Sequence, residues 1–105
     1  MKTSTANDQS CTASIKLLGD FWTLRIIGAL ESGGLRFCEL QRSVGNVNPV
    51  TLTDRLKKLE HAELVERSEE TVDGCSVSYA LTSLGREALP VISAIDQFAQ
   101  KTQIA

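Results

Sequence analysis

The stretch LRFCELQRSVGNVNPVTLTDRLKKLEHAELV, residues 35–65, decides the fold of this chain. It predicts two short helices joined by a tight turn at Gly45-Asn46, because both residue types tolerate turn conformations. The second helix is expected to begin at Asn48-Pro49: Asn is a favoured N-cap, and proline fits the first helical position, where the backbone N–H has no partner. Two helices joined in this way form a helix-turn-helix unit, whose second helix is suited to the major groove of DNA.

The two helices each have an apolar side and a polar side. Their apolar residues follow helical spacing and are expected to form a shared core: Phe37, Leu40 and Val44 in the first helix, Leu52, Leu56 and Leu59 in the second. At 100° per residue, the opposite side of the second helix carries Val50, Thr51, Asp54, Lys57, Lys58 and His61. This side is free to touch a partner.

The segments before and after this unit predict further elements. Residues 1–10 are polar and are expected to form a flexible tail, so that the folded domain spans residues 11–105. Helices are expected at residues 12–18 and 21–32, with Trp22 in the core, and a very short strand at 35–37. These assignments place three helical segments and one strand ahead of the second helix of the pair.

The C-terminal half predicts a hairpin followed by a helix. Val77, Tyr79 and Leu81 alternate with small residues, which is typical of a strand with one buried face, and this strand is expected to pair with residues 65–69 as a wing. A last helix is expected over residues 84–99, capped by Thr82 and bent near Arg86 because Pro90 removes a backbone hydrogen bond. The fold class is therefore mostly α with a small β wing (α+β), a winged helix-turn-helix.

Composition limits the possible functions. The chain has 105 residues, 42% of them hydrophobic, which suits one domain with a modest core that needs a partner. No apolar run approaches the roughly 20 residues of a membrane span and no signal peptide is visible, so a cytoplasmic protein without membrane contact is expected. The three cysteines show no metal-ligand spacing, and we expect neither metal nor cofactor. The single histidine, His61, has no suitable catalytic partner, so an enzyme is not expected.

Charge is distributed unevenly along the chain. The net charge is −2, whereas a DNA-binding protein usually has a basic patch. Residues 36–58 nevertheless contain five basic and two acidic side chains, a local charge of +3, while residues 65–81 contain one basic and four acidic side chains, a local −3. The positive charge thus coincides with the predicted helix pair, and the predicted wing is acidic.

Four motifs occur in an order that resembles a known family. LGDFWTLRIIGAL, LRFCELQRSV, NPVTLTDRLKKLEHAELVER and VSYALTSLGREALPVI lie within residues 11–99 and are similar to the HxlR family of winged helix-turn-helix transcriptional regulators, a bacterial and archaeal group related in architecture to the MarR regulators. The resemblance implies a homodimer on a palindromic operator in double-stranded DNA, more often a repressor than an activator. A twofold dimer would present its two second helices to half-sites roughly 34 Å apart.

The DNA-binding candidates follow from the helix pair and from the resemblance. Thr51, Asp54 and Lys58 are expected to face outward. Arg55 lies at the edge of the apolar face, within reach of a phosphate or of the preceding helix; the family typically has an arginine here, so the resemblance implies that Arg55 contacts the DNA backbone. The full set of candidates is Arg36, Arg42, Ser43, Asn48, Val50, Thr51, Asp54, Arg55, Lys58 and Arg67. The alternative interpretation is a charged face that is simply solvated.

Two features depart from the family pattern. The wing carries only Arg67 as a basic residue, although positive charge favours contact with the DNA backbone. Asp20-Phe21 stands where the family more often has Gly and Lys. We expect this change to alter the surface near the first two helices without touching the core.

Family members pair through their terminal helices, and this chain has apolar residues to do so. The predicted interface consists of Ile15, Leu18, Leu84, Ala88, Val91, Ile92, Ile95 and Phe98. The alternative is that these residues all belong to the core of one chain.

Cys11 and Cys38 are the candidate redox-sensing residues, for an oxidant or small-molecule effector that the sequence does not identify. Cys11 is expected just before the first helix, where the helix dipole favours the reactive thiolate. Inert, structural cysteines are the alternative.

A different class of function also fits the acidic wing: a winged-helix module that binds protein and not DNA. The dependence of DNA affinity on salt separates the two, since each phosphate contact releases counterions.

Overall fold

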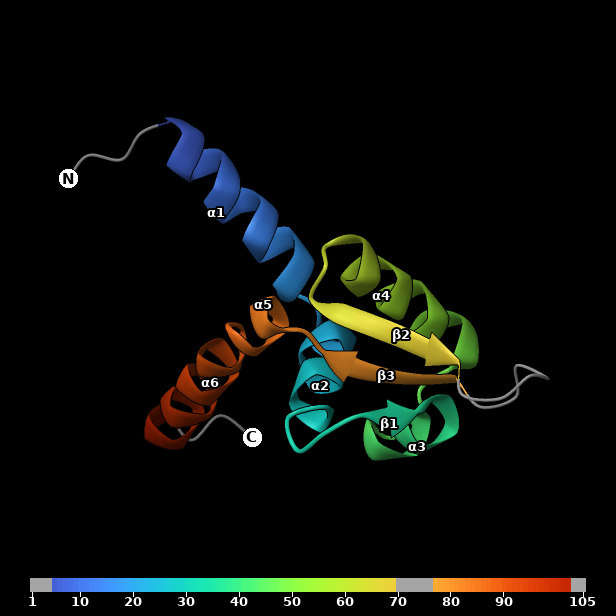
Figure 1. Cartoon of the computed structure of the whole chain (residues 1–105). Coiled ribbons are helices and arrows are strands. Elements are labelled where there is room, and N and C mark those ends of the chain that lie inside the picture. The colour runs from blue at the N-terminus through green and yellow to red at the C-terminus, as the bar shows by residue number, and fades with distance from the viewer. Residues whose placement is uncertain (1–4, 70–76, 103–105) are drawn as a thin grey trace.

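The computed structural model describes residues 5–69 and 77–102 (Figure 1). In chain order its elements are α1 (Thr5–Leu18), α2 (Phe21–Ala29), β1 (Leu35–Arg36), α3 (Phe37–Ser43), α4 (Pro49–His61), β2 (Val65–Glu69), β3 (Val77–Leu81), α5 (Ser83–Arg86) and α6 (Leu89–Thr102). The mostly helical fold with a small sheet is the predicted one.

The predicted turn between α3 and α4 is confirmed in detail. Gly45 and Asn46 both have positive φ angles, 101° and 57°, a conformation that glycine and asparagine adopt more readily than other residues. The side-chain amide of Gln41 donates a 2.8 Å hydrogen bond to the carbonyl oxygen of Val47. Asn48 caps α4, because its Oδ1 accepts a 2.7 Å hydrogen bond from the backbone N–H of Val50. These contacts fix the angle at which α4 leaves the turn.

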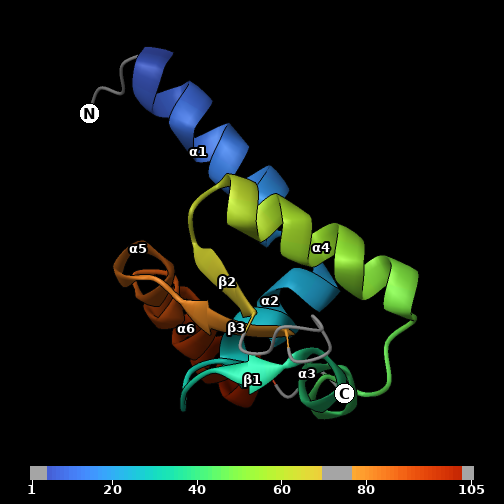
Figure 2. The same ribbon diagram turned by 45° about the vertical axis from the view of Figure 1, so that its right-hand side comes forward.

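The core gathers around α2. This helix contacts α1, α3, α4 and α6, and in Figure 2 it lies between α4 and α6. The fully buried side chains come from α2, α3 and α4, with Leu30 directly after α2 and Val44 directly after α3: Ile26, Ile27, Leu30, Leu40, Val44, Leu52, Leu56 and Leu59. Trp22 and Phe37 are half-buried and pack against this cluster. The apolar stripe predicted for α4 is therefore its packing face.

The three strands form one antiparallel sheet in the order β1-β3-β2. Val65 pairs with Leu81 and Arg67 pairs with Tyr79, so β2 and β3 form the hairpin predicted as the wing. Tyr79 and Leu81 are buried, which confirms the predicted alternation. The hairpin tip, with Cys75 and the predicted break at Asp73-Gly74, lies outside the described residues.

The first two helices of the chain, α1 and α2, have other bounds than predicted. α1 begins at Thr5, within the segment expected to be a tail, and neither glycine nor proline interrupts residues 5–18. α2 ends at Ala29, three residues before the predicted end. Asp20 begins α2 as its N-cap.

The predicted last helix is two helices, α5 and α6. Pro90 is the second residue of α6, a position in the first turn that tolerates the missing N–H, and the helix breaks between Arg86 and Leu89 where the proline ring would clash. Thr82 caps α5 as predicted, its Oγ1 accepting a 3.0 Å hydrogen bond from the N–H of Gly85. Gly85 packs directly on the backbone of Leu64, so any side chain there would collide with that carbonyl.

The two terminal helices extend from the body. In Figure 1, α1 and α6 project to the left, away from the end of β2 and the start of β3, and the molecule measures 53 × 34 × 23 Å. No residue of α6 is fully buried. Within residues 5–69 and 77–102, no helix is both long enough and apolar enough to cross a membrane.

Candidate nucleic-acid interface

The side of α4 that faces away from the leucines is open to solvent. Val50 is 78% exposed, although it is a large aliphatic residue, and the side chains of Lys58 and Asp54 are 62% and 48% exposed. Thr51 is half-buried. None of the predicted reading residues is enclosed in the core.

Two adjoining hollows extend this face towards the sheet. The first, of about 380 Å³, is lined by Pro49, Val50, Thr53, Asp54 and Lys57. The second, of about 510 Å³, is lined by Arg36, Phe37, Cys38, Thr53, Arg67, Val77 and Tyr79. Because Thr53 lines both, α4, the start of α3 and the wing present one continuous surface.

Thr53 and Lys57 are candidate contacts that the sequence-based set omitted. Lys57 lies on the exposed side of α4, three residues from Asp54, and the helical projection already placed it there. Thr53 lies at the border of the exposed side, where only the neighbouring sheet shows that it is part of the surface.

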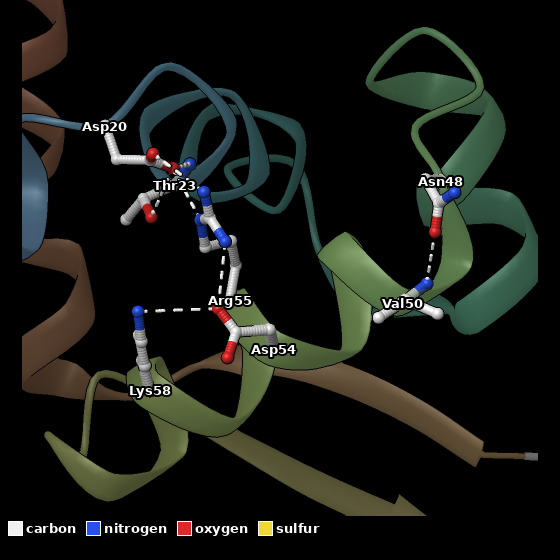
Figure 3. Close-up of polar contacts among 7 residues, drawn as sticks. All are labelled: Asp20, Thr23, Asn48, Val50, Asp54, Arg55 and Lys58. Atoms are coloured by element: carbon white, nitrogen blue, oxygen red, sulfur yellow. Dashed lines mark hydrogen bonds and ion pairs between the residues drawn. The ribbon is translucent and has the colours of Figure 1, made fainter.

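A network of charged side chains runs from the start of α2 to the exposed face of α4 (Figure 3). Arg55 donates to both carboxylate oxygens of Asp20, from Nε to Oδ2 over 2.9 Å and from Nη2 to Oδ1 over 3.1 Å. Its Nη1 donates to Asp54 Oδ2 over 2.8 Å, and Lys58 Nζ lies 3.4 Å from the same oxygen. Asp20 also accepts from the backbone N–H and the hydroxyl of Thr23.

The network shifts the pKa values of its members in one consistent direction. The hydrogen bond from Arg55, with smaller help from Thr23, outweighs the cost of burial and lowers the pKa of Asp20 to about 2. The Arg55 hydrogen bond also lowers the pKa of Asp54, aided by Lys58. Asp20, and to a lesser extent Asp54, raise the pKa of Arg55. All three groups are therefore charged at neutral pH.

The structure corrects the expectation for Asp20 and shows which element Arg55 braces. Asp20 does more than alter a surface: it caps α2 and binds α4 through a bidentate ion pair. Arg55 braces α4 against the start of α2, and not against the preceding helix α3. The sequence did not show this pair because its members are 35 residues apart.

The wing contributes little free positive charge. Arg67 Nη2 lies 2.7 Å from Glu69 Oε2, and this hydrogen bond is the main cause that raises the pKa of Arg67. By contrast, Arg36, Arg42 and Lys57 form no ion pair within the described part of the chain. Among the predicted DNA-binding residues and Lys57, the cations free of an ion pair therefore lie on α3, α4 and the residue before α3.

Of the other predicted contacts, Ser43 lies elsewhere, and Asn48 and the backbone of Arg36 have structural roles. Ser43 lines a groove between α2 and α6 together with Arg25 and Asp96, away from the exposed face of α4. Asn48 is used as the cap of α4, and the backbone N–H of Arg36 donates to Glu39 at the start of α3.

The predicted pairing surface is largely exposed in the single chain. Ile15, Leu84, Val91, Ile95 and Phe98 are 42% to 64% exposed. Leu18 and Ile92 are half-buried against the core. Ala88 is only 6% exposed and belongs to the core, so it is not part of this surface.

The position of Cys11 differs from the expectation. α1 begins at Thr5, so Cys11 lies in the middle of the helix and the argument from the helix N-terminus does not apply. The residue is exposed and lines an apolar hollow of about 290 Å³ with Ile15, Val91 and Ile95, between α1 and α6. Cys38, in the first turn of α3 as predicted, is also exposed.

The helix pair with its three-stranded sheet defines the class of this protein as a winged helix-turn-helix. The chain belongs to the HxlR-like helix-turn-helix family, whose sequence pattern matches residues 17–104. It is therefore a transcriptional regulator of the helix-turn-helix type.

Named relatives agree with this assignment. The chain is 34% identical over 91 residues to BH0655 of Halalkalibacterium halodurans, an uncharacterised HTH-type transcriptional regulator, covering 86% of this chain and 80% of that protein. The reduced form of the transcriptional regulator YodB from Bacillus subtilis superposes with a TM-score of 0.75 at 31% identity, covering 86% and 88% of the two chains. A structure from Porphyromonas gingivalis W83, assigned to the MarR family, superposes with a TM-score of 0.82 at 29% identity, covering 95% of this chain and 97% of that chain.

Proposed function

We propose that this protein is a homodimeric repressor that recognises a palindromic operator by inserting α4 into the major groove of DNA. The observation that carries the proposal is the exposed side of α4: it is polar, adjoins available cations and is buried against no other element. A helix held by its leucines on one side and open on the other is suited to base contact. The family resemblance favours repression over activation.

The side chains divide into two groups by their chemistry. Val50, Thr53 and Asp54, in the first two turns of α4, are placed to contact base edges, and a methyl group on Val50 or Thr53 suits the thymine methyl. Arg36, Arg42 and Lys57 are placed to contact phosphates, which position the protein without reading sequence. Arg55 acts indirectly, by holding α4 in place.

Pairing through the terminal helices supports the homodimer. α6 has fourteen residues, none of them fully buried, and its exposed Ile95 and Phe98 lie on the same side. A monomer would leave this apolar surface in water, which is unusual for a small soluble domain. A twofold dimer covers it and duplicates α4 for two half-sites roughly one helical turn apart.

The test of DNA recognition is fluorescence anisotropy with DNA from upstream of the protein's own gene, titrated with salt. We expect the affinity to fall steeply as salt rises, and Lys57→Ala to reduce the slope of log affinity against log salt by about 0.9, the value for one phosphate contact. Lys101→Ala, which removes one positive charge from the end of α6, is the matched control and should leave the slope unchanged. An affinity independent of salt, or no DNA binding, would favour a protein-binding module.

We further propose that Cys11 makes the dimer responsive to thiol-reactive compounds. Its thiol is exposed in the hollow between α1 and α6, so a group attached to Sγ would lie against the pairing surface. YodB, a relative with 32% identity over 89 residues, has been solved in diamide-treated and quinone-bound forms. These observations favour Cys11 over Cys38, whose hollow adjoins the wing.

The thiol hypothesis predicts that diamide lowers operator affinity at least about tenfold in the wild-type protein and in Cys38→Ser. The same treatment should have little effect on Cys11→Ser, because the reactive sulfur is absent. Anisotropy before and after treatment, followed by reduction with dithiothreitol, measures the response. A full diamide response in Cys11→Ser would refute this role.

A further inference from the structure

We propose that Asp54 selects a cytosine in each half-site: its Oδ1 accepts a hydrogen bond from the N4 amino group of that base in the major groove. This inference rests on the proposed function, since it requires α4 to enter the groove. It goes further by assigning one base to one side chain.

The carboxylate of Asp54 is oriented before any DNA arrives. Arg55 Nη1 and Lys58 Nζ both contact Oδ2, at 2.8 and 3.4 Å, and within the described residues Oδ1 accepts no hydrogen bond (Figure 3). Arg55 cannot swing freely, because Asp20 holds its Nε and Nη2. The orientation of Asp54 is thus set by a chain of contacts that begins at α2, and a fixed acceptor loses little entropy on binding.

The charge state of Asp54 restricts what it can bind. Because the hydrogen bond from Arg55 lowers its pKa, the side chain is ionised at neutral pH and can only accept hydrogen bonds. Its position on the exposed side of α4, in the wall of the hollow with Val50 and Thr53, gives that acceptor access to a base edge.

The donor pattern of the major groove then selects the base. Guanine presents two acceptors and thymine an acceptor and a methyl group, so neither edge can donate to a carboxylate. Adenine presents a donor beside the acceptor N7, which repels the second lone pair of an anion. Cytosine presents a donor without an adjacent acceptor, and is therefore the best partner for Asp54.

An anion on the DNA-facing side also penalises wrong sequences. The phosphates repel Asp54. Arg55 offsets this repulsion only in part because it also pairs with Asp20, and Lys58 does so only in part because it is exposed to solvent. On a site without cytosine the carboxylate gains no hydrogen bond in return. Specificity of this kind arises from weakened binding to wrong partners as well as from the correct contact.

The experiment selects preferred sequences from a randomised DNA library with the wild type, Asp54→Asn and Asp54→Ala. Wild type should require cytosine at one position of each half-site and lose about tenfold or more in anisotropy when that C·G pair is changed. Asp54→Asn should prefer adenine there, because an amide pairs with both N6 and N7 of adenine. Asp54→Ala should show no preference at that position and should bind random DNA more tightly than wild type.

Glu60→Gln, which removes one negative charge from the same helix, is the matched control and should keep the cytosine preference. If wild type selects no DNA sequence at all, the proposed function fails. If wild type selects a clear operator but Asp54→Asn retains every base preference, or no cytosine is selected, the assignment of Asp54 is overturned while the proposed function stands. Circular dichroism compares the helix content of each variant with that of wild type, and we expect no difference because the substituted side chains lie on the surface.

Discussion

An Ile95→Glu, Phe98→Glu double variant is expected to be monomeric and to bind the operator at least about a hundredfold more weakly than wild type. The two side chains are 46% and 61% exposed in the single chain, so the substitutions should leave its core intact. In a dimer they would place four carboxylates in an apolar contact, where unpaired charges are costly. The affinity falls because, in a monomer, binding of one α4 no longer raises the effective concentration of a second α4 at the other half-site.

Analytical ultracentrifugation measures the oligomeric state in this experiment, and anisotropy measures the affinity. The matched control is Ser93→Glu, Gln97→Glu, which adds the same charge on the other side of α6, where both residues are also exposed. We expect the control to remain a dimer with near wild-type affinity. If the Ile95, Phe98 variant stayed dimeric, the pairing surface would have to lie elsewhere.

Asp20→Ala is expected to destabilise the protein by about 2–3 kcal/mol, and Asp20→Asn by about 1–2 kcal/mol. Alanine removes both the cap of α2 and the ion pair with Arg55, whereas asparagine retains the capping oxygen and loses the charge. Both variants should bind the operator more weakly, since α4 loses its attachment to α2. Urea unfolding measures the stability and anisotropy the affinity.

Acid unfolding provides an independent check of the same ion pair. The pKa of Asp20 falls from 3.8 to about 2 in the folded chain, so its contribution is fully present above pH 3.8 and is lost as the pH falls towards 2. Between these values the free energy of unfolding of the wild type should decrease more steeply than that of Asp20→Asn. The free energy of unfolding of Arg55→Lys, which keeps the charge without the planar guanidinium, should lie between the values for wild type and Arg55→Ala. Equal acid slopes in wild type and Asp20→Asn would contradict the assignment.

The sequence predicted the elements whose signals are local. Asn48-Pro49 determines the start of α4 because the cap and the first turn lie within three residues of each other. Gly45 and Asn46 occupy positive φ angles for reasons intrinsic to those residues. The leucine spacing of α4 and the alternation of β3 are likewise repeated patterns that identify the buried side without knowledge of the partner.

Local signals were weaker at the helix ends. Nothing in residues 5–11 marks a clear cap, so the extension of α1 to Thr5, which moves Cys11 into the middle of the helix, was not predicted. Pro90 predicted a bend near Arg86 in one last helix, whereas the structure has two helices there, because Pro90 lies in the first turn of α6 and not in a helix interior. Helix boundaries depend on small differences in free energy, which neighbouring elements readily change.

What the sequence by itself determined is the winged helix-turn-helix fold, the buried and exposed sides of α4, and the helix on which base contacts are to be sought. The tertiary structure alone decided that Asp20 holds Arg55, that Arg55 and Lys58 orient Asp54, and that Thr53 joins α4 to the wing. The physical reason is range: periodicity and capping act between residues a few positions apart, whereas an ion pair across 35 residues forms only when the path of the whole chain brings its partners together.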